Sequence, residues 1–322
     1  MKASEIKKVA VLGGSGMIGS SWTTNFLWRG LPVHVYDVSE ECLKTARDRV
    51  RGNLQYLVNK GLLTQEKMNV ALGLARYTTS METAVKDVPF IQEAAPEKYD
   101  VKQALLAEVD RYAPAEAVFA SSTSGLLITE IAKDSTHPER CLGAHPYNPP
   151  HLIPLIEISK GEKTSAAAVT LAYDFYRSLG KEPIILQKEA LGFIANRLSV
   201  ALYREAIDLV LKGVCSVEDI DKAVCFGPGL RYALMGPNLI YQLGGGPFGI
   251  KGIMQHIGPS VELWWADMAD WKKVPPAWPD MAQEGVLKEM ANRPEEQGKT
   301  PEEIARWRDD GLLALLKFLN KV

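Results

Sequence analysis

The sequence has little of what marks a metal protein, a disulfide-stabilised protein or a membrane protein. Its four cysteines, Cys42, Cys141, Cys215 and Cys225, form no Cys-x-x-Cys pair and no Cys/His cluster, so we expect no metal site and reduced thiols that pack as small hydrophobes. No uninterrupted apolar stretch approaches a membrane span, and the N-terminus runs almost directly into the first strand, which leaves no room for a cleavable signal. These absences predict a cytoplasmic protein that does not enter a membrane.

A strong excess of charge of either sign is also missing. Lys and Arg number 37 against 39 Asp and Glu, which gives a net charge of −2, and no dense basic run occurs. This balance argues against nucleic acid or an anionic membrane as a partner. With 46% apolar and 24% charged residues, the 322-residue chain is typical of a globular protein with one large or two ordinary domains.

Residues 7–37 predict a strand, a glycine turn, a helix and a second strand. The apolar run 9–12 is typical of a strand buried on both faces, and Gly14, Gly16 and Gly19 then form G-x-G-x-x-G at the start of a helix. Met17 and Ile18, within this motif, are candidate cofactor-binding residues together with the three glycines. We expect Gly14 to allow the tight turn, Gly16 to let a pyrophosphate reach the backbone, and Gly19 to let the helix press on the strand.

The same glycine spacing arises by chance often enough that its surroundings must decide between a structural turn and a dinucleotide site. The strand before it, the helix after it and Asp37 about twenty residues on favour the dinucleotide site. A carboxylate at position 37 would bind a ribose 2′-hydroxyl and repel a 2′-phosphate. Val38 and Ser39 supply no cation for such a phosphate, although Arg29 or Arg47 can fold toward it.

Alternating strands and helices continue along the first half of the chain and predict a doubly wound parallel sheet. We expect helices over 39–59, 64–72, 99–112 and 129–134, and strands over 74–78, 89–94, 117–121, 141–144 and 153–158. After residue 187 only helical patterns follow. We expect a helix over 191–212, a second helix that Ser216 caps, and a last helix that begins with a capping box at Thr300 and ends at Leu319. The sequence thus predicts a nucleotide-binding domain over 1–188 and a smaller, all-helical domain over 189–322.

Polar residues follow three successive strand ends, where a ligand of such a sheet lies. They are Glu97, the stretch 121–125 and the stretch 145–148. Each has a plain structural alternative: a solvated first-turn acid, a capping cluster, and a histidine with its hydrogen bonds satisfied beside a proline turn. Together, at one edge of a nucleotide-binding sheet, they favour a shared site.

His145 and Glu157 are a candidate catalytic pair. A proline-rich turn follows His145, and the next strand carries Glu157, whose carboxylate can hold the imidazole in one tautomer and stabilise the imidazolium. The alternative is that Glu157 pairs with a Lys or Arg. Cys141 lies close before His145, but no partner that would make it a nucleophile is evident.

From end to end the chain resembles the 3-hydroxyacyl-CoA dehydrogenase superfamily. The motifs that carry the resemblance are Gly14-Ser-Gly-Met-Ile-Gly19, Gln92-Glu-Ala-Ala-Pro-Glu97, Ser121-Ser-Thr-Ser124, Ala144-His-Pro-Tyr-Asn-Pro149 and Gly192-Phe-Ile-Ala-Asn-Arg197. The resemblance implies an NAD-dependent oxidoreductase and a homodimer. It implies that His145 is the base and Glu157 its orienter, and that Ser124 and Asn196 hydrogen-bond the reacting oxygen. It also implies a set of residues that contact NAD or its immediate shell: Asp37, Glu97, Lys102, Ser124 and Asn148.

Within the superfamily the chain is similar to the branch that contains λ-crystallin (L-gulonate 3-dehydrogenase) and L-carnitine dehydrogenase, which act on free acids. This similarity rests on the motif from Gly229 to Gly236 and on the forms of the serine and histidine motifs. Residues 244–265 are closer to the carnitine enzymes. Asn196, in contrast, is closer to the gulonate and acyl-CoA branches. We expect Arg231 to bind the carboxylate of a small 3-hydroxy acid, since a guanidinium suits that group. For Arg231 the alternative is an internal salt bridge to Glu218, Asp219 or Asp221. For the whole protein the alternatives are a dehydrogenase that acts on a 3-hydroxyacyl-CoA and a non-catalytic, crystallin-like protein.

The roles of Trp264, Trp265 and His256 stay open from sequence. An aromatic pair can cage a quaternary ammonium group, but buried packing is the commoner use of tryptophan.

Overall fold

The computed structural model describes residues 1–322, which form two compact units. Unit 1 contains residues 1–197 and 311–322, and unit 2 contains residues 198–310. The division after residue 188 into a nucleotide-binding domain and a helical domain stays a prediction.

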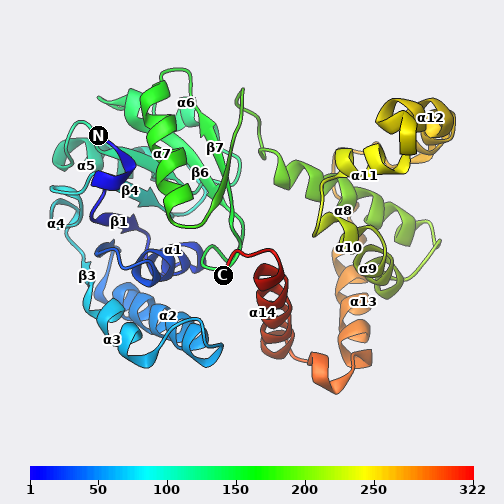
Figure 1. The fold of residues 1–322 in the computed structure, drawn as a ribbon, viewed down its shortest axis with the longest axis horizontal. Coiled ribbons are helices and arrows are strands. Elements are labelled where there is room, and N and C mark those ends of the chain that lie inside the picture. The colour runs from blue at the N-terminus through cyan, green and yellow to red at the C-terminus, as the bar shows by residue number, and fades with distance from the viewer. The chain divides into compact units, whose positions relative to one another are not determined.

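Unit 1 is built on an eight-stranded sheet in the order β3-β2-β1-β4-β5-β6-β7-β8 (Figure 1). The order reverses between β1 and β4, which is where a doubly wound sheet opens a crevice for a ligand. The predicted Rossmann-like fold is therefore confirmed. The strands are β1 (Val9–Leu12), β2 (Val33–Tyr36), β3 (Ala75–Thr78), β4 (Phe90–Glu93), β5 (Val118–Ser121), β6 (Cys141–Pro146), β7 (Leu155–Lys160) and β8 (Glu182–Ile185).

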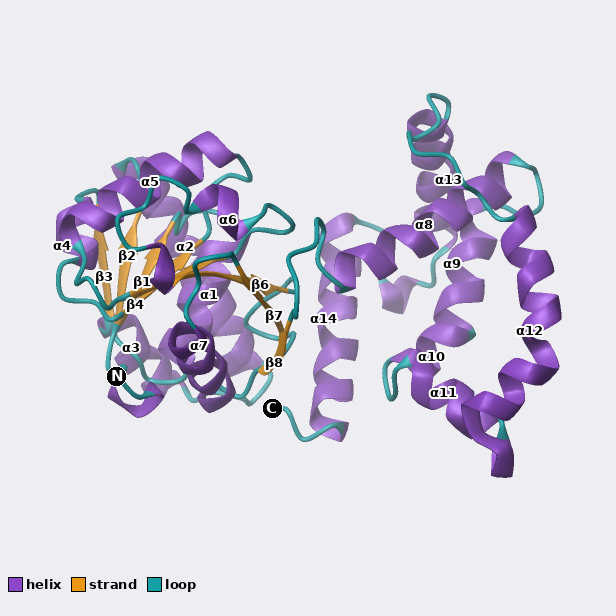
Figure 2. Cartoon of the chain, turned by 90° about the horizontal axis from the view of Figure 1, so that it is seen from above, coloured by secondary structure: helices purple, strands orange, loops and turns teal.

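Helices cover both faces of this sheet, and Figure 2 shows the strands as a middle layer with α5 and α7 on opposite sides. Alternate residues of β1 enter different cores: Val9 and Val11 pack on the side of α1, and Ala10 and Leu12 on the side of α5. Every residue of β1 is buried, as the apolar run predicts. The helices of this unit are α1 (Met17–Trp28), α2 (Glu40–Asn59), α3 (Gln65–Gly73), α4 (Met81–Val85), α5 (Tyr99–Tyr112), α6 (Ile128–Ile131) and α7 (Ala166–Ser178).

Two features of the sheet differ from the predicted one. Strand β7 runs antiparallel to β6, because the short proline-rich turn after His145 reverses the chain instead of crossing over through a helix. Strand β8 was not predicted, since Glu182–Ile185 offers only two consecutive isoleucines behind a proline. All the other strand pairs are parallel.

The first helix of the predicted second domain starts later than its sequence pattern indicates. Helix α8 runs over Ala195–Leu211, and the expected start at residue 191 is wrong. Gly192 and Phe193 have φ values of +73° and +48°, which a right-handed helix does not contain. Helix α8 therefore begins at Ala195, and its residues 195–197 belong to unit 1.

Unit 2 contains helices and no strand, as predicted. Ser216 caps α9 in a capping box, and Thr300 and Glu303 cap α14 in the same way. None of the helices combines the length and apolar character that crossing a bilayer requires. The helices that follow α8 are α9 (Val217–Phe226), α10 (Pro228–Tyr232), α11 (Pro237–Gly244), α12 (Gly249–Asp267), α13 (Trp278–Asn292) and α14 (Pro301–Phe318), and the last turns of α14 belong to unit 1.

Candidate active site

The glycine turn after β1 is shaped by close packing. Gly13 supplies the left-handed conformation of the turn, with φ +84°, and Gly14 beside it has no positive φ but leaves no room for a side chain. A Cβ on Gly14 would lie 2.2 Å from a Val35 methyl, and one on Gly19 would lie 2.1 Å from the Gly13 carbonyl oxygen. Gly19 therefore lets α1 press on the strand, as the motif predicts.

Gly16 differs from its neighbours because packing leaves room for a side chain there. Its Cβ would meet nothing closer than 3.7 Å. Gly16 also caps α1 without a side-chain hydrogen bond, which leaves the first N–H groups of the helix free for an anion. Met17, at the first position of the helix, is 67% exposed. A bare turn beneath a helix N-terminus fits the pyrophosphate of a dinucleotide.

Asp37 lies just past β2 and is nearly buried. Its Oδ2 accepts a hydrogen bond from the Ser15 N–H at 2.8 Å, and its Oδ1 accepts one from the Val38 N–H at 2.8 Å. A carboxylate has about four acceptor positions, so two stay available for ribose hydroxyls. The structure thus fixes Asp37 to the glycine turn in the way that an adenosine ribose site requires.

The cation closest to this turn is one that sequence reasoning missed. Arg29 stacks on Trp28 and Arg47 lies over the Tyr77 ring, so neither folds toward Asp37. Arg49 instead donates from Nη1 to the Ser15 carbonyl at 2.6 Å. Its place on the α2 face toward the turn, twelve residues past Asp37, was the available signal.

His145 and Glu157 face each other across β6 and β7, whose antiparallel register pairs these two residues directly. His145 Nδ1 lies 2.8 Å from Glu157 Oε2, and both side chains are buried. Glu157 has no Lys or Arg partner, so the predicted contact forms and its alternative does not. A proton on Nδ1 leaves Nε2 as the basic nitrogen.

Glu157 also holds the start of α8. Its Oε1 accepts the N–H groups of Ile194 and Ala195 at 2.8 and 2.9 Å. Burial raises the pKa of Glu157, but the hydrogen bonds from His145 and from these two amides outweigh burial and lower that pKa below its ordinary value. The carboxylate therefore stays charged while it holds the imidazole and the helix carrying Asn196.

Ser124 and Asn196 lie together, as predicted. The Asn196 amide donates one hydrogen to the Ser124 carbonyl at 2.9 Å, which leaves its second hydrogen and the Ser124 hydroxyl without a partner in the chain. Glu97 is not merely a solvated acid. Its Oε1 accepts from the Thr123 hydroxyl at 2.6 Å and from the Ser124 N–H at 2.7 Å, so it fixes the serine loop.

Lys102 lies beneath this loop and is only 1% exposed. It donates to both carboxylate oxygens of Glu93, at 2.8 and 3.0 Å, and lies 3.4 Å from Glu97 Oε2. Ser121 also donates to Glu93. Sequence reasoning missed the role of Glu93, although the residue stands inside the quoted motif that ends at Glu97. Lys102 thus belongs to the support of the site and does not face its opening.

A pocket of about 190 Å³ lies at the carboxyl ends of the strands. It brings together five predicted site residues: Ile18 from the first turn of α1, Ser124, His145, Asn148 and Asn196. Ser122, Pro146 and Tyr147 complete the lining. Cys141 at the start of β6 is buried, and burial raises the pKa of its thiol to about 12, so it is no nucleophile at neutral pH.

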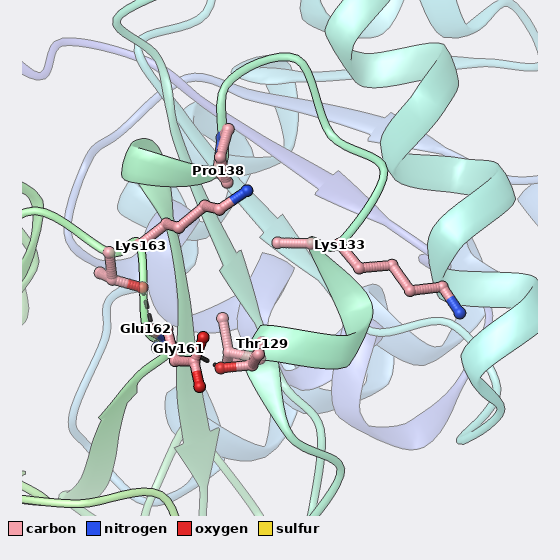
Figure 3. A pocket seen from close by; sticks show the side chains of 9 residues that line it. Thr129, Lys133, Pro138, Gly161, Glu162 and Lys163 are labelled. Atoms are coloured by element: carbon pink, nitrogen blue, oxygen red, sulfur yellow. Dashed lines mark hydrogen bonds between the residues drawn. The ribbon is translucent and has the colours of Figure 1, made fainter.

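A second pocket, of about 210 Å³, lies beside α6 and the turn after β7. Figure 3 shows Lys163 extending across it toward Pro138, whereas the amine of Lys133 points away. Thr129 is already engaged, because it accepts from the Glu162 N–H at 2.9 Å and donates to Glu189 at 2.5 Å. None of the predicted site residues lines this pocket.

Arg231 lies on α10 in unit 2, and its side chain is exposed. The alternative salt bridge does not form: Glu218 pairs with Lys222, Asp219 caps its own helix, and Asp221 contacts Glu289. Trp264 and Trp265 are 62% and 68% exposed on α12, so they are not used as buried packing in the chain.

A buried histidine and carboxylate beside a dinucleotide turn define a nicotinamide-dependent dehydrogenase. Comparison with known proteins gives the family. Residues 8–190 match the 3-hydroxyacyl-CoA dehydrogenase NAD binding domain, and residues 192–307 match the 3-hydroxyacyl-CoA dehydrogenase C-terminal domain. The chain belongs to the 3-hydroxyacyl-CoA dehydrogenase family, and it is an NAD-dependent 3-hydroxy acid dehydrogenase.

Individual relatives match over nearly the whole chain. L-Carnitine dehydrogenase of Pseudomonas aeruginosa is 41% identical over 99% of this chain and 95% of its own, and that of Oceanobacillus iheyensis is 35% identical over 98% and 99%. Among solved structures, 5-formyl-3-hydroxy-2-methylpyridine 4-carboxylic acid 5-dehydrogenase, described as an NAD+-dependent dismutase, has a TM-score of 0.78, with 28% identity and 97% of each chain covered. FadB2 of M. tuberculosis has a TM-score of 0.70, with 31% identity over 87% of this chain and 94% of its own.

Proposed function

We propose that this enzyme oxidises the 3-hydroxyl of L-carnitine to the 3-oxo acid with NAD as the hydride acceptor. The observation that carries the proposal is the match, at 41% identity over 99% of the chain, to an L-carnitine dehydrogenase. The exposed and unpaired Arg231 supports a substrate with a free carboxylate. The acyl end of a 3-hydroxybutyryl-CoA thioester presents no carboxylate for it to bind, although the phosphates of CoA are anions too.

In the proposed mechanism His145 is the general base. Its Nε2 takes the proton of the substrate hydroxyl, and Glu157, bonded to Nδ1 at 2.8 Å, stabilises the imidazolium that results. NAD, when bound on the glycine turn, supplies the acceptor for the hydride that leaves the same carbon. The buried carboxylate keeps the charge on the ring balanced throughout the transfer.

Ser124 and Asn196 are proposed to hold the reacting oxygen. The Ser124 hydroxyl and the second Asn196 amide hydrogen have no partner in the chain, and both residues line the pocket with His145. Donors fixed in advance stabilise an oxygen whose charge changes during the reaction. Glu97 keeps the serine loop in place through the Ser124 N–H.

The test of substrate class is NAD reduction by the wild-type enzyme with L-carnitine, L-gulonate, L-3-hydroxybutyrate and L-3-hydroxybutyryl-CoA. We expect L-carnitine to give the highest kcat/KM. Far faster turnover of the CoA thioester than of any free acid would replace the proposal by the acyl-CoA activity. Equal rates with L-gulonate would reduce it to a general 3-hydroxy acid activity.

Arg231→Met tests the proposed carboxylate contact. Its KM for L-carnitine should rise at least about tenfold, or about 1.4 kcal/mol, because a charge-assisted pair is lost. Arg204→Met, at another exposed arginine of unit 2, is the matched control and should leave KM unchanged. An unchanged KM in Arg231→Met would remove Arg231 from the substrate site.

We also propose that the enzyme is a homodimer that works in the cytoplasm. Unit 2 has only three buried hydrophobic residues, Ile207, Ala269 and Trp278. Its exposed apolar side chains include Leu198, Leu202, Leu263 and Phe248, at 50% to 78% exposure. A unit of this size needs more apolar burial, and we propose that a second copy of the chain covers these side chains. Light scattering after gel filtration tests the mass: a monomer at micromolar concentration would refute the dimer.

A further inference from the structure

The hydroxyl of Ser122, directly after β5, is surrounded by donors. The Gln92 amide nitrogen lies 2.9 Å from Ser122 Oγ, and the Trp22 indole nitrogen lies 3.2 Å from the same oxygen. An indole N–H can only donate. Ser122 therefore accepts a hydrogen bond from Trp22. The orientation of the Gln92 amide decides whether Ser122 also accepts a hydrogen bond from Gln92 or donates one to it.

The carbonyl of Ala120 fixes that orientation, and the Tyr176 hydroxyl is compatible with it. Gln92 Nε2 also lies 3.2 Å from the carbonyl oxygen of Ala120, which only accepts, so the nitrogen and not the oxygen must face β5. On its other side, Gln92 Oε1 accepts from the Tyr176 hydroxyl at 2.5 Å. Trp22, Gln92 and Tyr176 are all fully buried, so no water competes for these bonds.

A hydroxyl has two acceptor lone pairs and one hydrogen to donate. Both lone pairs of Ser122 are taken, by Gln92 and Trp22, and no carbonyl or side chain of the protein accepts its hydrogen. Ser122 is half-buried and lines the pocket that contains His145. Two buried side chains, Gln92 and Trp22, thus leave the Ser122 hydroxyl as a hydrogen-bond donor at the wall of the pocket.

The position of Ser122 identifies the ligand that meets this donor. The proposed substrate contacts, Ser124, Asn196 and His145, line the same pocket as Ser122. Ile18 also lines it and belongs to the first turn of α1, where the glycine turn leaves room for a pyrophosphate. A nicotinamide must lie between the pyrophosphate and the carbon that loses hydride. Trp22, which holds Ser122, is on α1 itself.

We propose that Ser122 donates a hydrogen bond to an oxygen acceptor on the nicotinamide half of bound NAD, either the carboxamide oxygen or a hydroxyl of the adjoining ribose. The inference rests on the proposed placement of the reaction at His145. Ser122 thereby acts as a positioning residue that fixes how the nicotinamide lies beside the substrate. Its polarity is set from the core by Gln92 and Trp22.

The test is the affinity of Ser122→Ala for NADH, ADP-ribose and ADP, measured by calorimetry without substrate. NADH should bind about three- to tenfold more weakly, because one neutral hydrogen bond is lost, while ADP, which lacks the nicotinamide half, should bind as in the wild type. A matching loss for ADP-ribose assigns the acceptor to the ribose, and an unchanged ADP-ribose affinity assigns it to the carboxamide. Ser178→Ala, at an exposed serine, is the control.

Equal losses for NADH and ADP, or no loss for either, would overturn the proposal. So would a loss seen only in the KM for the hydroxy acid, since Ser122 would then contact the substrate. A crystal structure of the wild-type enzyme with NADH serves if Ser122→Ala does not fold: a Ser122 Oγ beyond hydrogen-bond distance of every oxygen of the nicotinamide half refutes the contact. These binding measurements do not depend on the identity of the substrate, so they can succeed if L-carnitine proves wrong.

Discussion

Replacing Glu157 by glutamine separates the two tasks that this carboxylate performs. The amide oxygen of Glu157→Gln can still accept the N–H groups of Ile194 and Ala195, so the start of α8 stays in place. The amide nitrogen then faces His145 Nδ1 and donates to it, which forces the imidazole proton onto Nε2. The pocket-facing nitrogen of His145 would no longer be a base.

The expected losses differ in size. Turnover should fall by about three to four powers of ten, the range found when a carboxylate that orients a catalytic histidine becomes an amide. The free energy of unfolding should fall by only about 1 to 2 kcal/mol, since a charge-assisted bond is replaced by a neutral one and the cavity stays filled. Glu157→Ala loses both anchors and should be destabilised further, by about 3 kcal/mol or more.

The assay is NADH formation under saturating substrate, together with NADH affinity and denaturant unfolding of each variant. Glu116→Gln, at an exposed carboxylate, controls for the change of charge. NADH affinity should stay within about twofold of the wild type, because Glu157 does not line the pocket. Turnover of Glu157→Gln within tenfold of the wild type would refute the orienting role, and a collapse of stability would show that anchoring α8 is its main task.

Three further outcomes are expected. His145→Gln should lose about two to four powers of ten in turnover with NADH affinity nearly unchanged, and near-normal turnover would remove His145 from the mechanism. NAD should be preferred over NADP because of Asp37, and equal kcat/KM with the two cofactors would contradict this. Burial, and next the charge of Lys181, lower the pKa of His151 to about 4. Below a pH of about 6.5 the unfolded chain therefore binds more protons at this residue than the folded chain does. The free energy of unfolding should fall by about 3 kcal/mol as the pH drops from about 6.5 to 4. In His151→Gln the free energy of unfolding, measured with urea at these pH values, should fall less steeply than in the wild type. An identical fall would show that other groups cause it.

The local parts of this structure could be predicted because neighbouring residues specify them. The buried run 9–12 and the three glycines after it predict the first strand, turn and helix. The pairing of His145 with Glu157 was predictable for a related reason, since a short turn joins their strands and makes them neighbours in the sheet. In both cases the contacts span few residues.

The parts that sequence reasoning missed depend on distant contacts or on single backbone angles. Trp22, Gln92 and Tyr176 converge on Ser122 from three elements, and Trp22 is 100 residues away from Ser122 in the chain. The late start of α8 follows from the left-handed φ of Phe193, which its apolar, helix-like pattern does not reveal. The buried Lys102 likewise requires the carboxylate of Glu93 as its ion-pair partner. In the sequence Glu93 looks like an ordinary polar residue at the end of a strand.

The first residues of α8 belong to unit 1, and this has an evolutionary consequence. Every residue proposed to take part in bond making, including Asn196, falls within residues 1–197, and Glu157 locks the helix start to the histidine. Residues 198–310 can therefore diverge under selection for new substrates while the reacting groups keep their geometry. The proposed chemistry thus lies in one unit, and the proposed specificity contact, Arg231, lies in the other.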